Sequence, residues 1–109
     1  MKPLAGIRIL TVEQFGAAPY GTMFLADLGD EVIKIESRAD GGEPSRRMGP
    51  YLLGDGDSEY FQSWNLNKRS ILLDLKSTAG QAALQRLVVG ADAVVNNLRG
   101  HLPAKLGLD

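Results

Sequence analysis

Short apolar runs and amphipathic stretches alternate in the first third of the chain. Residues 7–12 are predicted to form a short, largely β-branched and apolar strand, and residues 31–36 a second strand with Val32, Ile33 and Ile35 as its apolar content. Residues 23–28 form a broad apolar surface at helical spacing. Pro19 suits the first position of that helix, and Gly29 suits its carboxyl end. A strand, a helix and a strand within about 30 residues predict a right-handed βαβ unit with parallel strands.

The same alternation returns in the last third of the chain. Residues 70–75 and 91–95 are predicted strands. Between them, Ala83, Leu84, Leu87 and Val88 recur at helical spacing, residues 78–81 read as a capping box, and Gly90 can end the helix. Residues 37–57 are polar and glycine-rich. A connection of this length is usually functional or mobile, and a short helical turn at 60–65 follows it.

The pattern as a whole predicts an α/β fold with a Rossmann-like parallel sheet and flanking helices. Residues 1–109 form one domain on this reading, because the length suffices for a single hydrophobic core. No closing helix is predicted after the last strand. Four strands with this little cover would leave apolar sheet surface exposed, so we expect a fragment of a longer protein, truncated before the rest of its fold.

Composition removes several kinds of chemistry. The chain has no cysteine, so disulfides, thiolate metal sites and a cysteine nucleophile are excluded. Its one histidine, His101, leaves almost no material for a histidine metal site or a serine triad, and we expect no metal. The net charge of -1 argues against nucleic acid or an anionic membrane as a partner. We find no signal peptide and no apolar run of membrane-spanning length, and we expect a cytoplasmic protein.

The turn that follows the first predicted strand has the means to hold an anion. Gly16 and Gly21 flank four residues as in a P-loop, but the required lysine is absent, and no dinucleotide fingerprint is present. Glu36 lies at the end of the second strand, where Rossmann enzymes keep a ribose-binding acid. The backbone N–H groups at the helix start can bind an anion or a carbonyl; alternatively, the glycines only permit close packing.

A second candidate is the basic pair Lys68-Arg69. These residues are good phosphate ligands, and the alternative is a solvated basic turn before a strand. Trp64 could stack on a base or pack in the core. Taken alone, the residues predict no more than a parallel α/β domain with the capacity for an anionic ligand.

Several blocks of sequence, in order, resemble the opening of the family III CoA-transferases (the CaiB/BaiF type). These blocks are residues 4–10, 15–23, 25–36, Asn67-Lys68-Arg69-Ser70-Ile71, residues 73–76 and Ala91-Asp92-Ala93-Val94-Val95. Together they cover nearly the whole chain. The resemblance implies an enzyme that moves coenzyme A between carboxylic acids, with CoA or acyl-CoA and a carboxylic acid as its partners and a homodimer as the full-length assembly.

In this family, an aspartate attacks the acyl-CoA and the reaction passes through mixed-anhydride and thioester intermediates. That aspartate would lie beyond residue 109, so no catalytic residue is assigned here and the isolated chain is expected to be inactive. The segment itself would bind the nucleotide part of CoA. Two alternatives stay open: a segment of an α-methylacyl-CoA racemase, and a non-catalytic CoA-binding remnant.

The resemblance places the CoA contacts at the carboxyl ends of strands, the edge at which open parallel sheets bind ligands. The implied residues are Phe15, Gly16, Ala17, Arg38 or its neighbour Ser37, Leu73, Asp74, Leu75, Lys76, Asn97, Leu98 and Lys105. The sequence departs from the family at Gly16, where some members have glutamine, and at Ser37, where the family has a basic residue. Residues 96–101 lack the acid, the aromatic residue and the proline that many relatives have there, on the side of the expected adenine contact.

Overall fold

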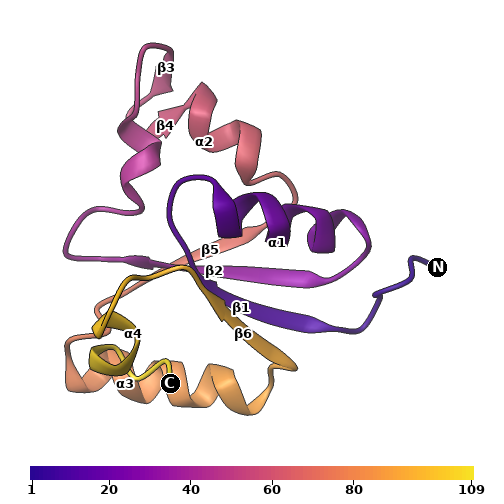
Figure 1. The fold of residues 1–109 in the computed structure, drawn as a ribbon, viewed down its shortest axis with the longest axis vertical. Coiled ribbons are helices and arrows are strands. Elements are labelled where there is room, and N and C mark those ends of the chain that lie inside the picture. The colour runs from indigo at the N-terminus through magenta and orange to yellow at the C-terminus, as the bar shows by residue number, and fades with distance from the viewer.

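Four parallel strands form the central sheet of the computed structural model, which describes all 109 residues. The strands β1 (Arg8–Val12), β2 (Glu31–Ser37), β5 (Arg69–Leu73) and β6 (Ala93–Asn96) lie in the order β5-β2-β1-β6. Helices α1 (Ala17–Asp27) and α2 (Glu59–Trp64) lie on one side of the sheet, and α3 (Thr78–Val89) and α4 (Leu102–Lys105) lie on the other (Figure 1). The predicted Rossmann-like α/β fold is confirmed.

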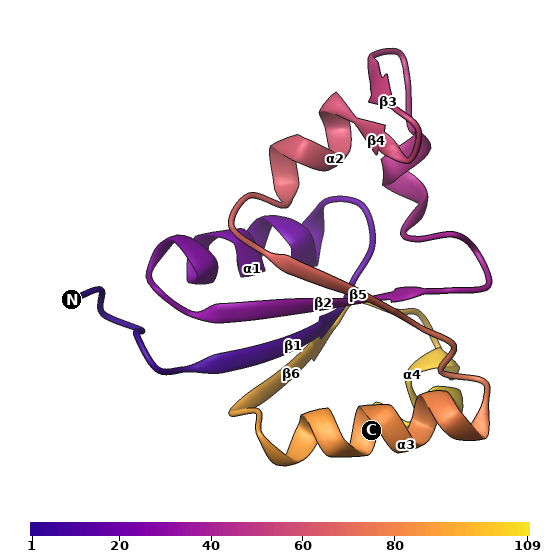
Figure 2. The same ribbon diagram turned by 180° about the vertical axis from the view of Figure 1, so that it is seen from behind.

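The alternation of side chains along the strands divides the core between the two faces. Leu10 of β1 and Ile35 of β2 pack with Leu84 of α3. On the opposite face, Ile9, Val32 and Ala26 of α1 form a smaller cluster. Figure 2 shows the same division from behind, with α3 along one face and α1 along the other. The expected exposure of apolar sheet surface is also present, because Leu72 on the edge strand β5 is 51% exposed.

The structure corrects three details of the sequence prediction. Strand β5 ends at Leu73, although the apolar run continues, because buried Leu75 packs against α3 from the following turn. Ser77, one residue before the predicted cap, caps α3 and accepts a hydrogen bond from Gly80 N–H (2.9 Å). A closing helix does exist: the four-residue α4 brings Leu106 against the core.

The long connection after β2 contains more regular structure than its composition predicts. A 3₁₀ helix, η1 (Pro44–Arg47), is followed by a two-stranded hairpin of β3 (Leu52–Gly54) and β4 (Asp57–Ser58). This segment lies on the α1 side of the sheet, above the carboxyl ends of the strands (Figure 1). None of the helices of the chain has the length and apolar character needed to cross a membrane.

Charged side chains are buried on the α1 face, beyond its apolar cluster. They form three ion pairs, Lys34–Glu43 (3.1 Å), Lys68–Glu13 (2.9 Å) and Arg46–Glu36 (2.7 Å). The side chain of Lys68 is only 2% exposed, and burial lowers its pKa although Glu13 opposes the change. Lys68 is therefore neither a free phosphate ligand nor part of a solvated turn. Arg69 points to solvent near Glu31.

The carboxylate of Glu36 is fully occupied by the chain itself. Its oxygens accept hydrogen bonds from Arg46 Nε and Nη2 (both 2.7 Å), from the backbone N–H of Glu43 (2.7 Å) and from the Ser70 hydroxyl. Burial raises the pKa of Glu36, but these hydrogen bonds outweigh it and lower the pKa to about 2. Both oxygens of Glu36 are therefore bonded within the chain, and neither is free to bind a ribose.

Gly80 allows α3 to approach the turn after β5. A Cβ at this position would overlap the backbone carbonyl of Asp74, whereas a Cβ at Gly21 in α1 would meet nothing within 4 Å. We expect Gly80→Ala to lower the free energy of unfolding by about 1–3 kcal/mol through overpacking. In contrast, Gly21→Ala should change it by at most about 1 kcal/mol, in the stabilising direction. Urea unfolding of both variants tests this, and equal stabilities would contradict it.

Acid should weaken the fold through Glu36. Its pKa is lowered from 4.5 to about 2 on folding, so its stabilising contribution is complete above the unfolded-state value and is lost as the pH falls through this interval. Between about pH 5 and pH 2, protonation of Glu36 should cost the unaltered chain up to about 3 kcal/mol of its free energy of unfolding. Glu36→Gln has no carboxylate to protonate, so its free energy of unfolding should fall less over the same interval, by this amount. Urea unfolding at several pH values measures the difference. Exposed Glu59→Gln is the control, and an unchanged slope for Glu36→Gln would refute the assignment.

Candidate functional site

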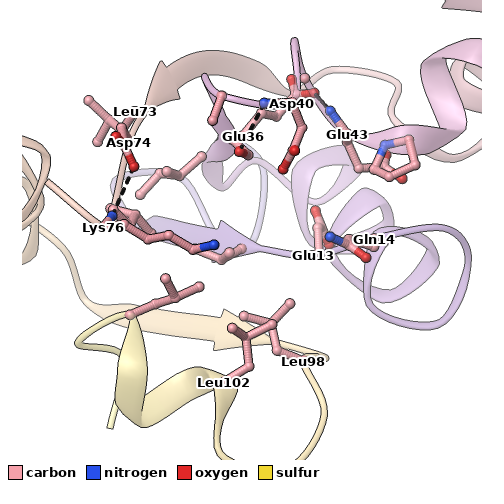
Figure 3. A pocket seen from close by; sticks show the side chains of 18 residues that line it. Glu13, Gln14, Glu36, Asp40, Glu43, Leu73, Asp74, Lys76, Leu98 and Leu102 are labelled. Carbon is pink, nitrogen blue, oxygen red and sulfur yellow. Dashed lines mark hydrogen bonds between the residues drawn. The ribbon is translucent and has the colours of Figure 1, made fainter.

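A cavity of about 180 Å³ opens at the carboxyl ends of β1, β2 and β5 (Figure 3). Its polar lining residues are Glu13, Gln14, Glu36, Ser37, Asp40, Glu43, Asp74 and Lys76, and Gly42 contributes backbone. Its apolar lining residues are Val12, Ile35, Ala39, Pro44, Leu73, Leu75, Leu98, Leu102 and Leu106. This is the edge at which an open parallel sheet binds a ligand.

The walls of the cavity differ in chemistry. Figure 3 shows Glu36, Asp40 and Glu43 on one side and Leu98 and Leu102 on the other. Glu36 and Glu43 are already held in ion pairs, so the charge they carry is compensated within the chain. The leucine side offers an apolar surface. A ligand with a flat or apolar group and a separate charged group matches these two walls.

Lys76 supplies a cation that the chain does not use. Its backbone N–H donates to Asp74 Oδ1 (3.0 Å), which fixes the turn after β5, and its side chain extends into the cavity (Figure 3). Lys76 takes part in none of the five ion pairs of the structure. An exposed ammonium group without a partner can bind an anionic group such as a phosphate.

The first turn, residues 15–17, lies beside the cavity and begins α1. Phe15 has a φ of 61°, in the left-handed region that a bulky residue rarely adopts. Its N–H donates to Glu43 Oε1 (2.8 Å), which ties this turn to the connection after β2. No side chain caps the amino end of α1, so its first N–H groups are free to bind an anion.

Asn97 closes the sheet between β1 and β6. Its side chain accepts a hydrogen bond from Gln14 N–H and donates one to Gln14 C=O (both 3.0 Å). The side-chain amide therefore continues the hydrogen bonding of the two strands beyond their ends. This use of Asn97 leaves it with a structural role at the rim of the site.

The sequence-predicted CoA contacts fall into two groups in space. Five of them line the cavity: Leu73, Asp74, Leu75, Lys76 and Leu98. The other six do not line it: Phe15, Gly16, Ala17, Arg38, Asn97 and Lys105. Each of these six is nevertheless adjacent in the chain to a lining residue or to another member of the first turn; Lys105, for example, directly precedes lining Leu106. All eleven stay predictions as ligand contacts.

Sequence reasoning missed the buried residues that fix these loops. Glu43 and Arg46 lie in a connection that we expected to be irregular, yet both reach the carboxyl half of β2. A signal was present in β2, where Lys34 and Glu36 alternate with apolar residues on one face of a predicted strand. Buried charges in a strand require partners, but the pattern does not say which residues supply them. The structure brings together no group of three His, Cys, Asp or Glu side chains suited to a metal ion.

Comparison with known proteins gives a consistent result. Residues 4–109 match the family model described as CoA-transferase family III. The chain is 40% identical to a succinate–glutarate CoA-transferase of Agrobacterium fabrum, over 98% of this chain and 28% of that protein. It is 42% identical to the succinyl-CoA:glutarate CoA-transferase of Mus musculus (97% and 23%) and 43% identical to the succinyl-CoA:mesaconate CoA-transferase of Haloarcula hispanica (91% and 25%). The chain thus spans about a quarter of the length of these curated relatives.

Solved structures agree on the fold. A crystal structure of a hypothetical protein from Mycobacterium tuberculosis superposes with a TM-score of 0.88 at 38% identity, over 100% of this chain and 29% of that one. A CaiB/BaiF family protein from Brucella suis gives a TM-score of 0.89 at 35% identity, over 99% and 29%. With residues 4–109 matched by the family model and its fold superposing on that of a CaiB/BaiF family protein, the chain belongs to CoA-transferase family III.

Proposed function

We propose that residues 1–109 form the CoA-binding amino-terminal domain of an enzyme that transfers coenzyme A between carboxylic acids. The observation that carries the proposal is the unpaired Lys76 ammonium, which extends into a cavity with a leucine wall at the carboxyl edge of the sheet. The phosphates of CoA match Lys76 and the free N–H groups of α1, and the adenine ring matches the leucine wall. The names of the relatives support the transfer of CoA.

The reacting carboxylate is proposed to lie outside this chain. In the family reaction, an aspartate attacks the acyl-CoA carbonyl and releases the CoA thiolate, which then attacks the mixed anhydride to give an enzyme thioester and the free acid. The acceptor carboxylate reverses these steps. A nucleophile must have a free oxygen, whereas Glu13, Glu36 and Glu43 of the cavity are held in ion pairs. Their pairing argues against these three glutamates as the nucleophile, whereas Asp40 and Asp74 of the cavity take part in no ion pair.

A CoA-transferase is favoured over the two alternatives, an α-methylacyl-CoA racemase and a non-catalytic protein that only binds CoA. The relatives described above are all named as CoA-transferases, and none of these names indicates a racemase or a protein that only binds CoA. Succinate or its CoA ester occurs in each name, so short dicarboxylic acids are the first substrates to test. The homodimer and the cytoplasmic location expected from the sequence stay predictions.

CoA should bind to the chain more tightly than NAD or ATP. CoA can place phosphates at Lys76 and its adenine on the leucines, whereas the carboxylate that NAD would need for its ribose, Glu36, is already occupied. We expect the Kd for CoA to be lower by at least about tenfold, the equivalent of one additional charge-assisted hydrogen bond. Isothermal calorimetry with the three ligands measures this, and a preference for NAD would contradict the proposal.

A pair of variants shows whether binding uses the cavity. Lys76→Met removes the cation and should raise the Kd for CoA by about tenfold. Arg86→Gln removes an exposed cation from the last turn of α3, away from the cavity, and should leave the Kd unchanged. Equal effects of the two substitutions would indicate only a general attraction between CoA and positive charge.

The 109-residue chain alone should show no transferase turnover, because the proposed nucleophile is absent from it. Radiolabelled succinyl-CoA with glutarate, mesaconate or malate as the acceptor provides the assay. Robust transfer of label by the isolated chain would place the nucleophile among its own residues, with Asp40 and Asp74 of the cavity as the first to substitute.

A further inference from the structure

Glu43 is a buried carboxylate to which two loops are attached. Its Oε1 accepts hydrogen bonds from the N–H groups of Phe15 (2.8 Å) and Ser45 (3.2 Å). Its Oε2 accepts from Lys34 Nζ (3.1 Å) and from the Ser45 hydroxyl (2.6 Å). One side chain, 3% exposed, thus joins the first turn after β1, the strand β2 and the start of η1.

The contact with Phe15 bears on an unfavourable backbone conformation. A bulky residue with a φ of 61° is destabilised by about 1–3 kcal/mol and persists only where its surroundings hold it. Glu43 provides the hydrogen bond that does so, because it is the acceptor for the Phe15 N–H. The Phe15 side chain is 41% exposed, so burial of the ring does not account for the conformation.

The remainder of the turn is anchored to the same buried network. Lys68 Nζ donates to Glu13 Oε1 and to Pro19 C=O (both 2.9 Å), so it joins a residue before the first turn to a residue after it. Asn65 Oδ1 accepts from both Lys68 (3.1 Å) and Lys34 (2.9 Å), and Lys34 pairs with Glu43. Between Glu13 and Pro19, Asn97 is hydrogen-bonded to the backbone of Gln14, and Glu43 holds Phe15, directly before the uncapped start of α1.

We propose that Glu43 is a positioning residue for CoA: by accepting the Phe15 N–H, it holds residues 15–17 in the conformation that presents the start of α1 to the phosphates. This inference rests on the proposed binding of CoA. Glu43 itself touches no phosphate, because both of its oxygens face groups of the chain. The negative charge of the Glu43 carboxylate would repel the phosphates of CoA.

Two double variants separate the hydrogen bond from the buried charge. Lys34→Met with Glu43→Gln, and Lys34→Met with Glu43→Met, both remove the ion pair and leave no uncompensated buried charge. Only the glutamine variant keeps an oxygen that can accept the Phe15 N–H. Amide hydrogen exchange by NMR and the Kd for CoA by calorimetry are measured for both variants and for the unaltered 109-residue chain.

The variant with Glu43→Met is called Met/Met here, and the variant with Glu43→Gln is called Met/Gln. We expect the Phe15 amide to exchange at least about tenfold faster in Met/Met than in Met/Gln, whereas the amides of β1 and β2 should exchange at equal rates in the two variants. The Kd for CoA should be at least about tenfold higher in Met/Met and within about threefold of the unaltered chain in Met/Gln. Uniform destabilisation would change all amides together and would not produce this pattern.

The outcomes distinguish the two proposals. If the unaltered chain binds CoA and the two double variants bind it equally, the role of Glu43 is overturned and the proposed function stands. If the Phe15 amide is unprotected in the unaltered chain, or exchanges equally in both variants, Glu43 does not hold the turn and the inference is also overturned. If the unaltered chain does not bind CoA, the proposed function fails, and with it the role of Glu43 in binding.

Discussion

Burial of charge on one face of the sheet is the constraint on which the rest of the site depends. Lys34 and Glu36 project from β2 into the protein interior, where an unpaired charge would be strongly destabilising. Their partners, Glu43 and Arg46, come from the connection after the strand, and Asn65 comes from the end of α2. The need to compensate these charges therefore determines where the connection, α2 and the first turn lie.

The two faces of the sheet consequently differ in composition. The face toward α3 is apolar and contains the larger core cluster, with Leu10 and Leu84 fully buried. The face toward α1 has a small apolar cluster at one end and ion pairs at the other. The cavity lies where the two regions meet at the strand ends, which gives it one wall of leucines and one wall of acids, of which Glu36 and Glu43 are paired within the chain. Lys76 enters this cavity without an internal partner, and this makes it available to a ligand.

The sequence predicted the strands and the main helices because their signals are local. The β-branched runs of β1 and β2 and the periodic leucines of α3 identify these elements without knowledge of the rest of the fold. The position of the cavity also followed, since carboxyl ends of parallel strands share one edge. The partners of Lys68 could not be predicted, because Glu13 lies 55 positions away and no local pattern connects them. Helix α4 has only four residues, too few for a periodic pattern, and its place depends on contacts of Leu106 with the core.

The reciprocal hydrogen bonds between Asn97 and Gln14 have a consequence for where any ligand can lie. In a doubly wound sheet, the gap between strands whose connections diverge to opposite faces is the usual entrance for a nucleotide. Here that gap separates β1 from β6, and a side-chain amide occupies it by imitating a further peptide unit. The cavity beside this closed gap is lined by residues from the ends of β1, β2 and β5 and by leucines that follow β6. One amide side chain thus keeps the ends of β1 and β6 together where a ligand would otherwise pass between them.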